Sequence, residues 1–203
     1  MKRLVQFSVR KMKIFCAKLI LVFVMSTLAS AAFAFEPAQT LKDNENGMTV
    51  DLYPVDGNFL FYGNIDIGYN VNIPHNIFTE VIHLSENGNG MILGSKDGTA
   101  RFSLTGGFMM DGESEEGKLR ESYDNACKAI GGEEEAVYSE IGDDYWELSW
   151  IEEDTLHRRE FLIKRGLGVW CELQISYFRI EGDVDPIHKL FDESLDSLAF
   201  PEG

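Results

Sequence analysis

The chain has 203 residues, 18 of them basic and 34 acidic, which gives a formal net charge of −16 at pH 7. This length suits a single domain with a sizeable core. The excess of carboxylates excludes nucleic acid and anionic membrane as binding partners, because phosphate groups are bound by lysine and arginine.

Residues 1–34 have the pattern of a secretory signal peptide. A head carrying six basic residues precedes an apolar core at residues 19–28, and Ala32-Phe33-Ala34 is an A-x-A cleavage motif. An uncleaved membrane anchor is the alternative, but the apolar run is short for a span and turns polar at Ser26 and Thr27. We therefore expect cleavage after Ala34, a periplasmic or secreted protein, and no membrane span in the processed chain.

The processed chain would keep 12 basic and all 34 acidic residues, for a formal charge of −22. Residues 35–48 are polar and broken by Pro37, Asn44, Asn46 and Gly47, so we expect a flexible lead-in there. A single domain would follow at residues 49–203. Its acidity favours solubility over a functional acidic surface.

Short β-like runs come first in the domain. They lie at residues 49–53, 58–62, 68–73, 78–84, 91–94 and 100–106, and turn signals such as Asp56-Gly57 and Asp97-Gly98 separate them. Of these runs, the ones within residues 49–67 are the hardest to place.

Two helices are expected. Residues 114–130 place Leu119, Tyr123, Cys127 and Ile130 at helical spacing, with Ser114 as N-cap. Gly117 weakens the first turn, so the regular helix could start nearer Lys118. The last helix opens at Asp185-Pro186.

Residues 144–178 follow the first helix and read as a three-stranded antiparallel meander, entered from a strand at residues 136–141. Its strands are expected at 144–151, 156–164 and 169–178, joined by Glu152-Glu153-Asp154 and by Gly166 and Gly168. The whole order predicts an α+β fold: an antiparallel sheet of about six to eight strands flanked by two main helices.

All three tryptophans lie in this meander. Trp146 and Trp150 alternate with polar residues and are expected in the core. Trp170 lies on the mixed face of its strand, opposite Cys171, so it is the tryptophan that we expect to be exposed and available to a partner.

Two cysteines remain if the leader, with its Cys16, is removed. An exported chain meets an oxidising compartment, so Cys127 and Cys171 could form a disulfide. Two buried free thiols are the alternative, since both residues lie on the apolar faces of their elements.

Five stretches between Tyr69 and Phe200 form a recognisable pattern: YNVNIPHNIFTE, ENGNGMILGSKDGTARFSLTGG, DDYWELSWIEED, GVWCELQISY and DPIHKLFDESLDSLAF. Together they resemble the PsbP-like α/β/α sandwich proteins. It implies an α/β/α sandwich and an accessory or binding role, as in a stabiliser of the photosynthetic oxygen-evolving complex or a Ran-binding transport factor. No partner-contact residues carry over from that family.

No reactive constellation stands out in the sequence. None of the histidines, His75, His83, His157 and His188, has zinc-ligand spacing, and each reads as a surface or capping residue. The acidic stretches at residues 43–47, 111–116, 133–135 and 152–154 suggest calcium, but none fits a calcium-binding loop, which favours solvated turns. No nucleophile motif is present.

We therefore expect an exported, non-enzymatic binding or accessory protein that contacts another envelope protein and needs no cofactor. The alternative is a periplasmic protein that binds a small molecule or a cation.

Overall fold

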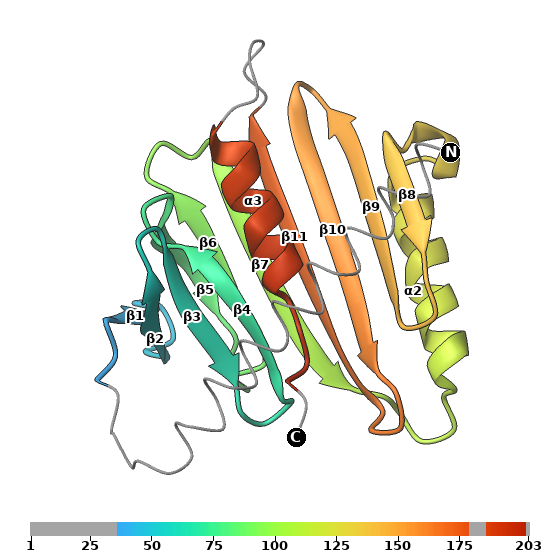
Figure 1. Ribbon diagram of the computed structural model, residues 1–203, viewed down its shortest axis with the longest axis horizontal. Helices are drawn as coiled ribbons and strands as arrows, with labels where there is room; N and C mark the ends of the chain where they lie inside the picture. Colours follow the sequence, from blue (N-terminus) through green and yellow to red (C-terminus); the bar gives the residue numbers. More distant parts are fainter. Residues whose placement is uncertain (1–35, 179–185, 202–203) are drawn as a thin grey trace, which may run out of the picture. The chain divides into compact units, whose positions relative to one another are not determined.

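The computed structural model describes residues 36–178 and 186–201, which hold eleven strands in two antiparallel sheets (Figure 1). The smaller sheet has the order β1-β2-β3-β4, from β1 (Gln39–Lys42), β2 (Thr49–Asp56), β3 (Phe59–Asn64) and β4 (Tyr69–Pro74). The larger has the order β5-β6-β7-β11-β10-β9-β8, from β5 (Phe78–Leu84), β6 (Gly90–Ser95), β7 (Ala100–Phe108), β8 (Tyr138–Ile141), β9 (Tyr145–Glu152), β10 (Thr155–Lys164) and β11 (Val169–Phe178). The helices are α2 (Glu115–Ala129), the short 3₁₀ helix η1 (Glu133–Glu135) and α3 (Pro186–Ser197).

The α+β class and the antiparallel sheet flanked by two helices are confirmed, and the larger sheet has seven strands. One difference is that residues 39–74 form a sheet of their own. Antiparallel pairing ends at β4, because Pro74 closes that strand and β5 pairs with β6 instead. Local alternation predicts strands but does not say which strands pair.

The larger sheet separates two hydrophobic cores. In β10, Leu162 packs into the core shared with the smaller sheet and α3, whereas Phe161 and Ile163 pack into the core under α2. Alternation along the strand therefore sends neighbouring side chains to opposite layers. Trp146 and Phe161 are stacked at 5.8 Å in the second core, and truncating a buried aromatic side chain of this kind costs about 3–5 kcal/mol.

Helix α2 begins at Glu115, earlier than Gly117 suggested. The Ser114 hydroxyl accepts a hydrogen bond from the Gly117 backbone N–H at 3.1 Å, as expected of an N-cap. A Cβ atom at residue 117 would lie 2.7 Å from that hydroxyl oxygen. The glycine therefore permits the cap contact instead of delaying the helix.

The expected lead-in at residues 35–48 contains ordered structure, which corrects the sequence interpretation. Gln39–Lys42 form β1, which pairs with β2, and Leu41 is buried. A single inward leucine among polar residues gives too weak a pattern to predict a strand. The expected signal peptide at 1–34 and the N-cap Asp185 lie outside the described residues.

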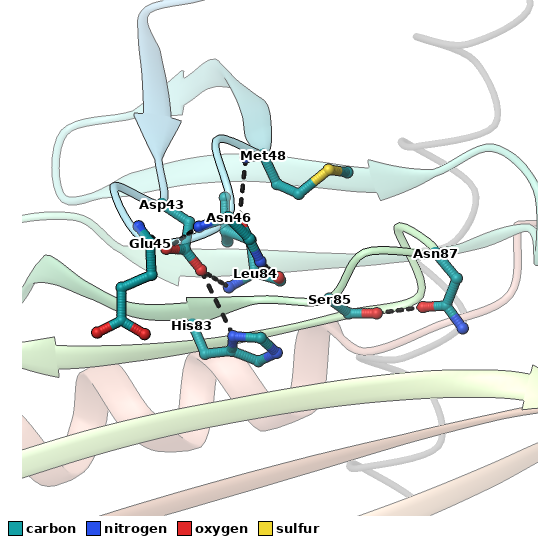
Figure 2. A network of polar contacts seen from close by, with 8 residues as sticks. All are labelled: Asp43, Glu45, Asn46, Met48, His83, Leu84, Ser85 and Asn87. Atoms are coloured by element: carbon teal, nitrogen blue, oxygen red, sulfur yellow. Dashed lines mark hydrogen bonds and ion pairs between the residues drawn. The ribbon is translucent and has the colours of Figure 1, made fainter.

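Asp43 anchors the loop after β1 to the end of β5 (Figure 2). Its carboxylate is 3% exposed and accepts hydrogen bonds from the backbone N–H groups of Glu45 at 2.8 Å and Leu84 at 2.9 Å. The Asn46 side chain donates to the Leu84 carbonyl oxygen at 2.6 Å, and His83 Nδ1 lies 3.4 Å from Asp43. The hydrogen bonds from the backbone N–H groups of Leu84 and Glu45 lower the pKa of the Asp43 carboxyl. The loop thereby joins the smaller sheet to the larger one.

The two cysteines are free thiols, so the structure shows the second alternative of the sequence and not the disulfide. Cys127 belongs to the core under α2, whereas Cys171 belongs to the core on the other side of the sheet. Burial raises the pKa of both thiols. Both therefore have the character of structural, unreactive cysteines.

Replacing Asp43 by Asn should lower the melting temperature at pH 7, because an amide cannot accept the same set of N–H donors. A carboxylate with a lowered pKa stabilises the fold above its ordinary pKa of 3.8, and this stabilisation is lost as the pH falls through the folded value. Thermal unfolding from pH 7 to pH 3 should show the gap between wild type and variant closing at the acidic end. Asp51→Asn, which removes an exposed carboxylate from neighbouring β2, is the control and should change little.

Thiol titration tests the cysteine assignment. The chain from Phe35 to Gly203 should show two thiols in denaturant without reductant and very slow labelling when native, because Cys127 is 8% and Cys171 0% exposed. A count of zero thiols in denaturant would contradict the structure.

Candidate functional site

Three large apolar side chains are strongly exposed at one end of the larger sheet. Phe108 is 64%, Met110 74% and Leu167 66% exposed. They come from two segments that are hydrogen-bonded to each other: Phe108 lies opposite Val169 in the ladder, and the Met109 N–H donates to the Gly168 carbonyl at 2.7 Å. We name Phe108, Met110 and Leu167 the apolar tip.

The backbone under the apolar tip is held in place. The Gly166 N–H donates to the Glu115 carboxylate at 2.6 Å, which ties the β10–β11 turn to the start of α2. The Met110 N–H donates to the Glu113 carboxylate at 2.8 Å, and the Glu113 N–H donates back to the Met110 carbonyl at 3.1 Å. The backbone at the apolar tip is therefore tied to Glu113 and to Glu115, the first residue of α2, while its side chains face solvent.

Trp170 pairs with Gly107, next to the apolar tip along the ladder, but its side chain lies on the opposite face of the sheet from Phe108. Its ring packs on Gly107, stacks on Phe161 at 5.6 Å and has the Lys118 ammonium 5.6 Å from its centre. The side chain is half-buried, and its indole nitrogen has no hydrogen-bond partner in the part of the chain that the structure describes. That nitrogen is itself buried, so it offers no hydrogen bond to a partner.

Gly106 and Gly107 lie between two aromatic rings on opposite faces of the sheet. A Cβ atom at Gly106 would lie 2.5 Å from the ring of Tyr69, and one at Gly107 would lie 3.0 Å from the ring of Trp170. Both layers therefore approach the backbone of β7 closely, one residue before the apolar tip begins.

The other two tryptophans, Trp146 and Trp150, differ in how deeply they are buried. Trp146 is fully buried, as expected, and its indole N–H donates to the Ser122 hydroxyl at 3.1 Å. Trp150 is half-buried, and its ring stacks on that of His157 with centres 4.7 Å apart and planes 6° apart.

The histidines do not come together. His83 is 52% exposed beside Asp43, His157 is 17% exposed beside Trp150, and His75 has a buried Nδ1 without a hydrogen-bond partner among the described residues. His188 was expected in an exposed place, but it is half-buried and its ring packs edge-on against Tyr177 at 4.9 Å. His188 is less exposed than expected because the Tyr177 side chain of β11 packs against its ring.

The acidic stretches serve local structure. At residues 43–47 the Asp43 carboxylate is occupied by N–H groups, and Glu133 in η1 accepts from the Tyr123 hydroxyl at 2.8 Å. Glu153 and Asp154 form the β9–β10 turn with φ of 46° and 64°. Across residues 36–178 and 186–201, no three His, Cys, Asp or Glu side chains gather in a way that could hold a metal ion.

Three glutamates lie in one row across neighbouring strands. Glu140 of β8 is opposite Glu147 of β9, which is opposite Glu160 of β10. Burial raises the pKa of Glu160 well above its ordinary value, and the charges of Glu147 and Asp196 raise it further. Like charges placed directly opposite each other destabilise a sheet.

The apolar tip was not predicted from the sequence. Phe108 and Met110 follow the alternating residues of β7 and look like a continuation of its apolar face. Their exposure depends on where the covering layer ends, and that depends on long-range packing. The glycine pairs at 106–107 and at 166 and 168 were the available local signal, since they mark an end of the sheet.

In the part of the chain that the structure describes, neither helix has the length and apolar character that crossing a membrane requires.

Glu160→Gln should raise the melting temperature at pH 7, because it removes a charge that the folded state disfavours. A carboxyl whose folded pKa is raised makes stability fall as the pH rises from its ordinary value of 4.5 through the folded value. The gain should therefore shrink towards pH 4.5 in thermal melts. Glu172→Gln is a useful control because Glu172 accepts an ion-paired hydrogen bond from Arg159 at 2.8 Å, and its replacement should lower stability instead.

No protein-family model matches the chain, and no curated protein matches its sequence. Among solved structures, the chain is similar to the solution structure of cyanobacterial PsbP (CyanoP) from Synechocystis sp. PCC 6803. The TM-score is 0.51 at 14% sequence identity, and the match covers 72% of this chain and 94% of that one. The two sheets, the helices and this match together show that the chain has a PsbP-like α+β fold.

Proposed function

We propose that this protein is an exported, non-enzymatic accessory protein that works by contacting another envelope protein, and that the apolar tip is its main contact. The observation that carries the proposal is the exposure of Phe108, Met110 and Leu167 on a fixed backbone. The expected signal peptide supports export, and the accessory role implied by the PsbP-like resemblance agrees with it.

Exposed apolar groups gathered in one place mark interaction sites, whereas single ones are ordinary. Aromatic and methionine side chains are enriched in protein interfaces, where a few anchors supply most of the binding free energy. A fixed backbone reduces the entropy lost on binding. The half-buried ring of Trp170, on the opposite face of the sheet, would be a separate contact.

Changing Phe108, Met110 and Leu167 together to Ser tests the proposal. A tagged processed chain should retain a defined set of proteins from an envelope extract, and the triple variant should lose it. Stability should change little, within about 0.5 kcal/mol per site, because the three side chains are exposed. Mass spectrometry of the retained proteins and a thermal melt are the two measurements.

Ile65→Ser is the matched control. Ile65 is 95% exposed and lies between β3 and β4, so its loss removes an apolar side chain outside the apolar tip. It should leave retention unchanged. If the wild-type chain retains nothing above background, or the triple variant retains the same set, the proposal is wrong.

A further inference from the structure

The chain contains three Asn-Gly sequences, which begin at Asn46, Asn87 and Asn89. In an Asn-Gly sequence the glycine backbone nitrogen can attack the side-chain carbon Cγ of the asparagine, because both groups belong to neighbouring residues and glycine has no Cβ atom in the way. The new N–Cγ bond closes a succinimide ring, and the amide NH₂ leaves as ammonia with the proton of the glycine N–H. Water then opens the ring and leaves aspartate or isoaspartate, in which the main chain runs through the side chain.

Asn46 is held in a geometry that opposes this reaction. Its side-chain Nδ2 donates to the Leu84 carbonyl at 2.6 Å, and its Oδ1 accepts from the Met48 N–H at 2.9 Å (Figure 2). The attacking nitrogen, that of Gly47, donates to the Asp43 carbonyl at 2.9 Å. All of these hydrogen bonds belong to the loop that joins the two sheets, so closing the ring would break that joint.

The backbone around Asn89 is held as well. Its carbonyl accepts from the Gly106 N–H at 2.9 Å and from the Tyr69 hydroxyl at 3.1 Å. The next residue, Gly90, is the first of β6 and is buried; a Cβ atom there would lie 2.6 Å from the Leu104 carbonyl oxygen. The nitrogen of Gly90 therefore cannot turn towards the Asn89 side chain without disturbing the pairing of β6 with β7.

Asn87 differs from both, because its side chain is exposed in the turn between β5 and β6. The Gly88 N–H makes a turn hydrogen bond to the Ser85 carbonyl at 3.0 Å, and Gly88 has a φ of 71°. The Asn87 amide oxygen accepts from the Ser85 hydroxyl (Figure 2) and from the Asn89 N–H at 3.4 Å. This oxygen gains negative charge when nitrogen attacks Cγ, so donors placed on it stabilise the intermediate. The Ser85 hydroxyl also reaches the Asn89 amide oxygen at 2.7 Å, and it donates to one oxygen at a time.

The next hairpin contains the same turn with a carboxylate in place of the amide. In Ser95-Lys96-Asp97-Gly98 the Gly98 N–H donates to the Ser95 carbonyl at 3.0 Å, and the Ser95 hydroxyl donates to the Asp97 carboxylate at 2.6 Å. Hydrogen bonds from Ser95 and Thr99 lower the pKa of Asp97 to about 2, so it is a carboxylate at neutral pH, which a nitrogen nucleophile attacks poorly. Aspartate therefore fits this turn, and the amide at Asn87 is the reactive version of it.

We propose that Asn87-Gly88 is a spontaneous modification site that converts to isoaspartate and aspartate, and that the Ser85 hydroxyl promotes the conversion. The site lies on a contact between the two sheets, because the Gly88 carbonyl accepts from the buried Asn64 side chain of β3 at 2.8 Å. Aspartate leaves the main chain as it is. Isoaspartate lengthens the main chain before Gly88 and so displaces this acceptor. The modification thereby loosens the contact of the turn with the smaller sheet.

Peptide mapping of the purified protein during incubation at pH 8 tests the site. Chromatography and mass spectrometry distinguish asparagine, aspartate and isoaspartate at each position. Asn87 should convert at least about tenfold faster than Asn46 and Asn89, and its rate should rise with pH as the attacking nitrogen loses its proton more readily. No conversion at Asn87, or conversion at Asn46 or Asn89 at the same rate, would overturn the proposal.

Ser85→Ala separates activation by the hydroxyl from loosening of the turn. Loss of the donor should slow conversion at Asn87 at least about threefold, whereas a turn that was merely looser would convert faster. Ser95→Ala makes the same change in the matching turn and should leave the rate at Asn87 unchanged. An unchanged or faster rate in Ser85→Ala, with folding checked by its melting temperature, would contradict the role of Ser85.

The structural consequence is tested with Asn87→Asp, which carries the charge of the product on an unmodified main chain. Protein converted to isoaspartate, separated by chromatography, should melt at least about 2 °C below this variant. The difference isolates the displaced Gly88 carbonyl from the added charge, because both forms carry a carboxylate. Equal melting temperatures would show that the contact with Asn64 does not depend on the main chain at Asn87, contrary to the inference.

Discussion

Strand β11 is the constraint on which the rest of the structure depends. All ten of its residues pair with β10 and nine pair with β7, so it joins the two halves of the larger sheet. Its odd-numbered residues fill one core, while Trp170 packs into the other. A shift of register by one residue would exchange these faces and empty both cores, so this pairing determines where every covering layer can lie.

Much of this arrangement could be predicted from the chain. The alternation at residues 169–178 and 156–164 predicted β11 and β10, and Ser114 was predicted as the N-cap of α2, because strand faces and helix caps are local properties. Gly117 had left a helix start nearer Lys118 open. Strand β1 could not be predicted, since Leu41 is its one buried apolar residue and its support comes from Asp43 and Leu84, 41 residues apart. The separation into two sheets could not be predicted either, because local alternation does not show that β4 and β5 belong to different sheets.

The candidate sites were predicted less well than the fold. The sequence placed Trp170 on the correct face, but Phe108, Met110 and Leu167 have the same composition as core residues. Their exposure follows from the place where the covering layers end.

Gly106 and Gly107 mark the boundary between positions whose side chains can change and positions where a side chain would disturb the packing. Side chains there would push Tyr69 on one face or Trp170 on the other away from β7, so these two positions fix the thickness of the molecule next to the apolar tip. Phe108 and Met110 follow directly, but their exposed side chains do not hold a packed layer in place. A lineage could therefore exchange the tip residues and recognise a new partner without rebuilding the layers, with the glycine pair acting as the boundary between scaffold and changeable surface.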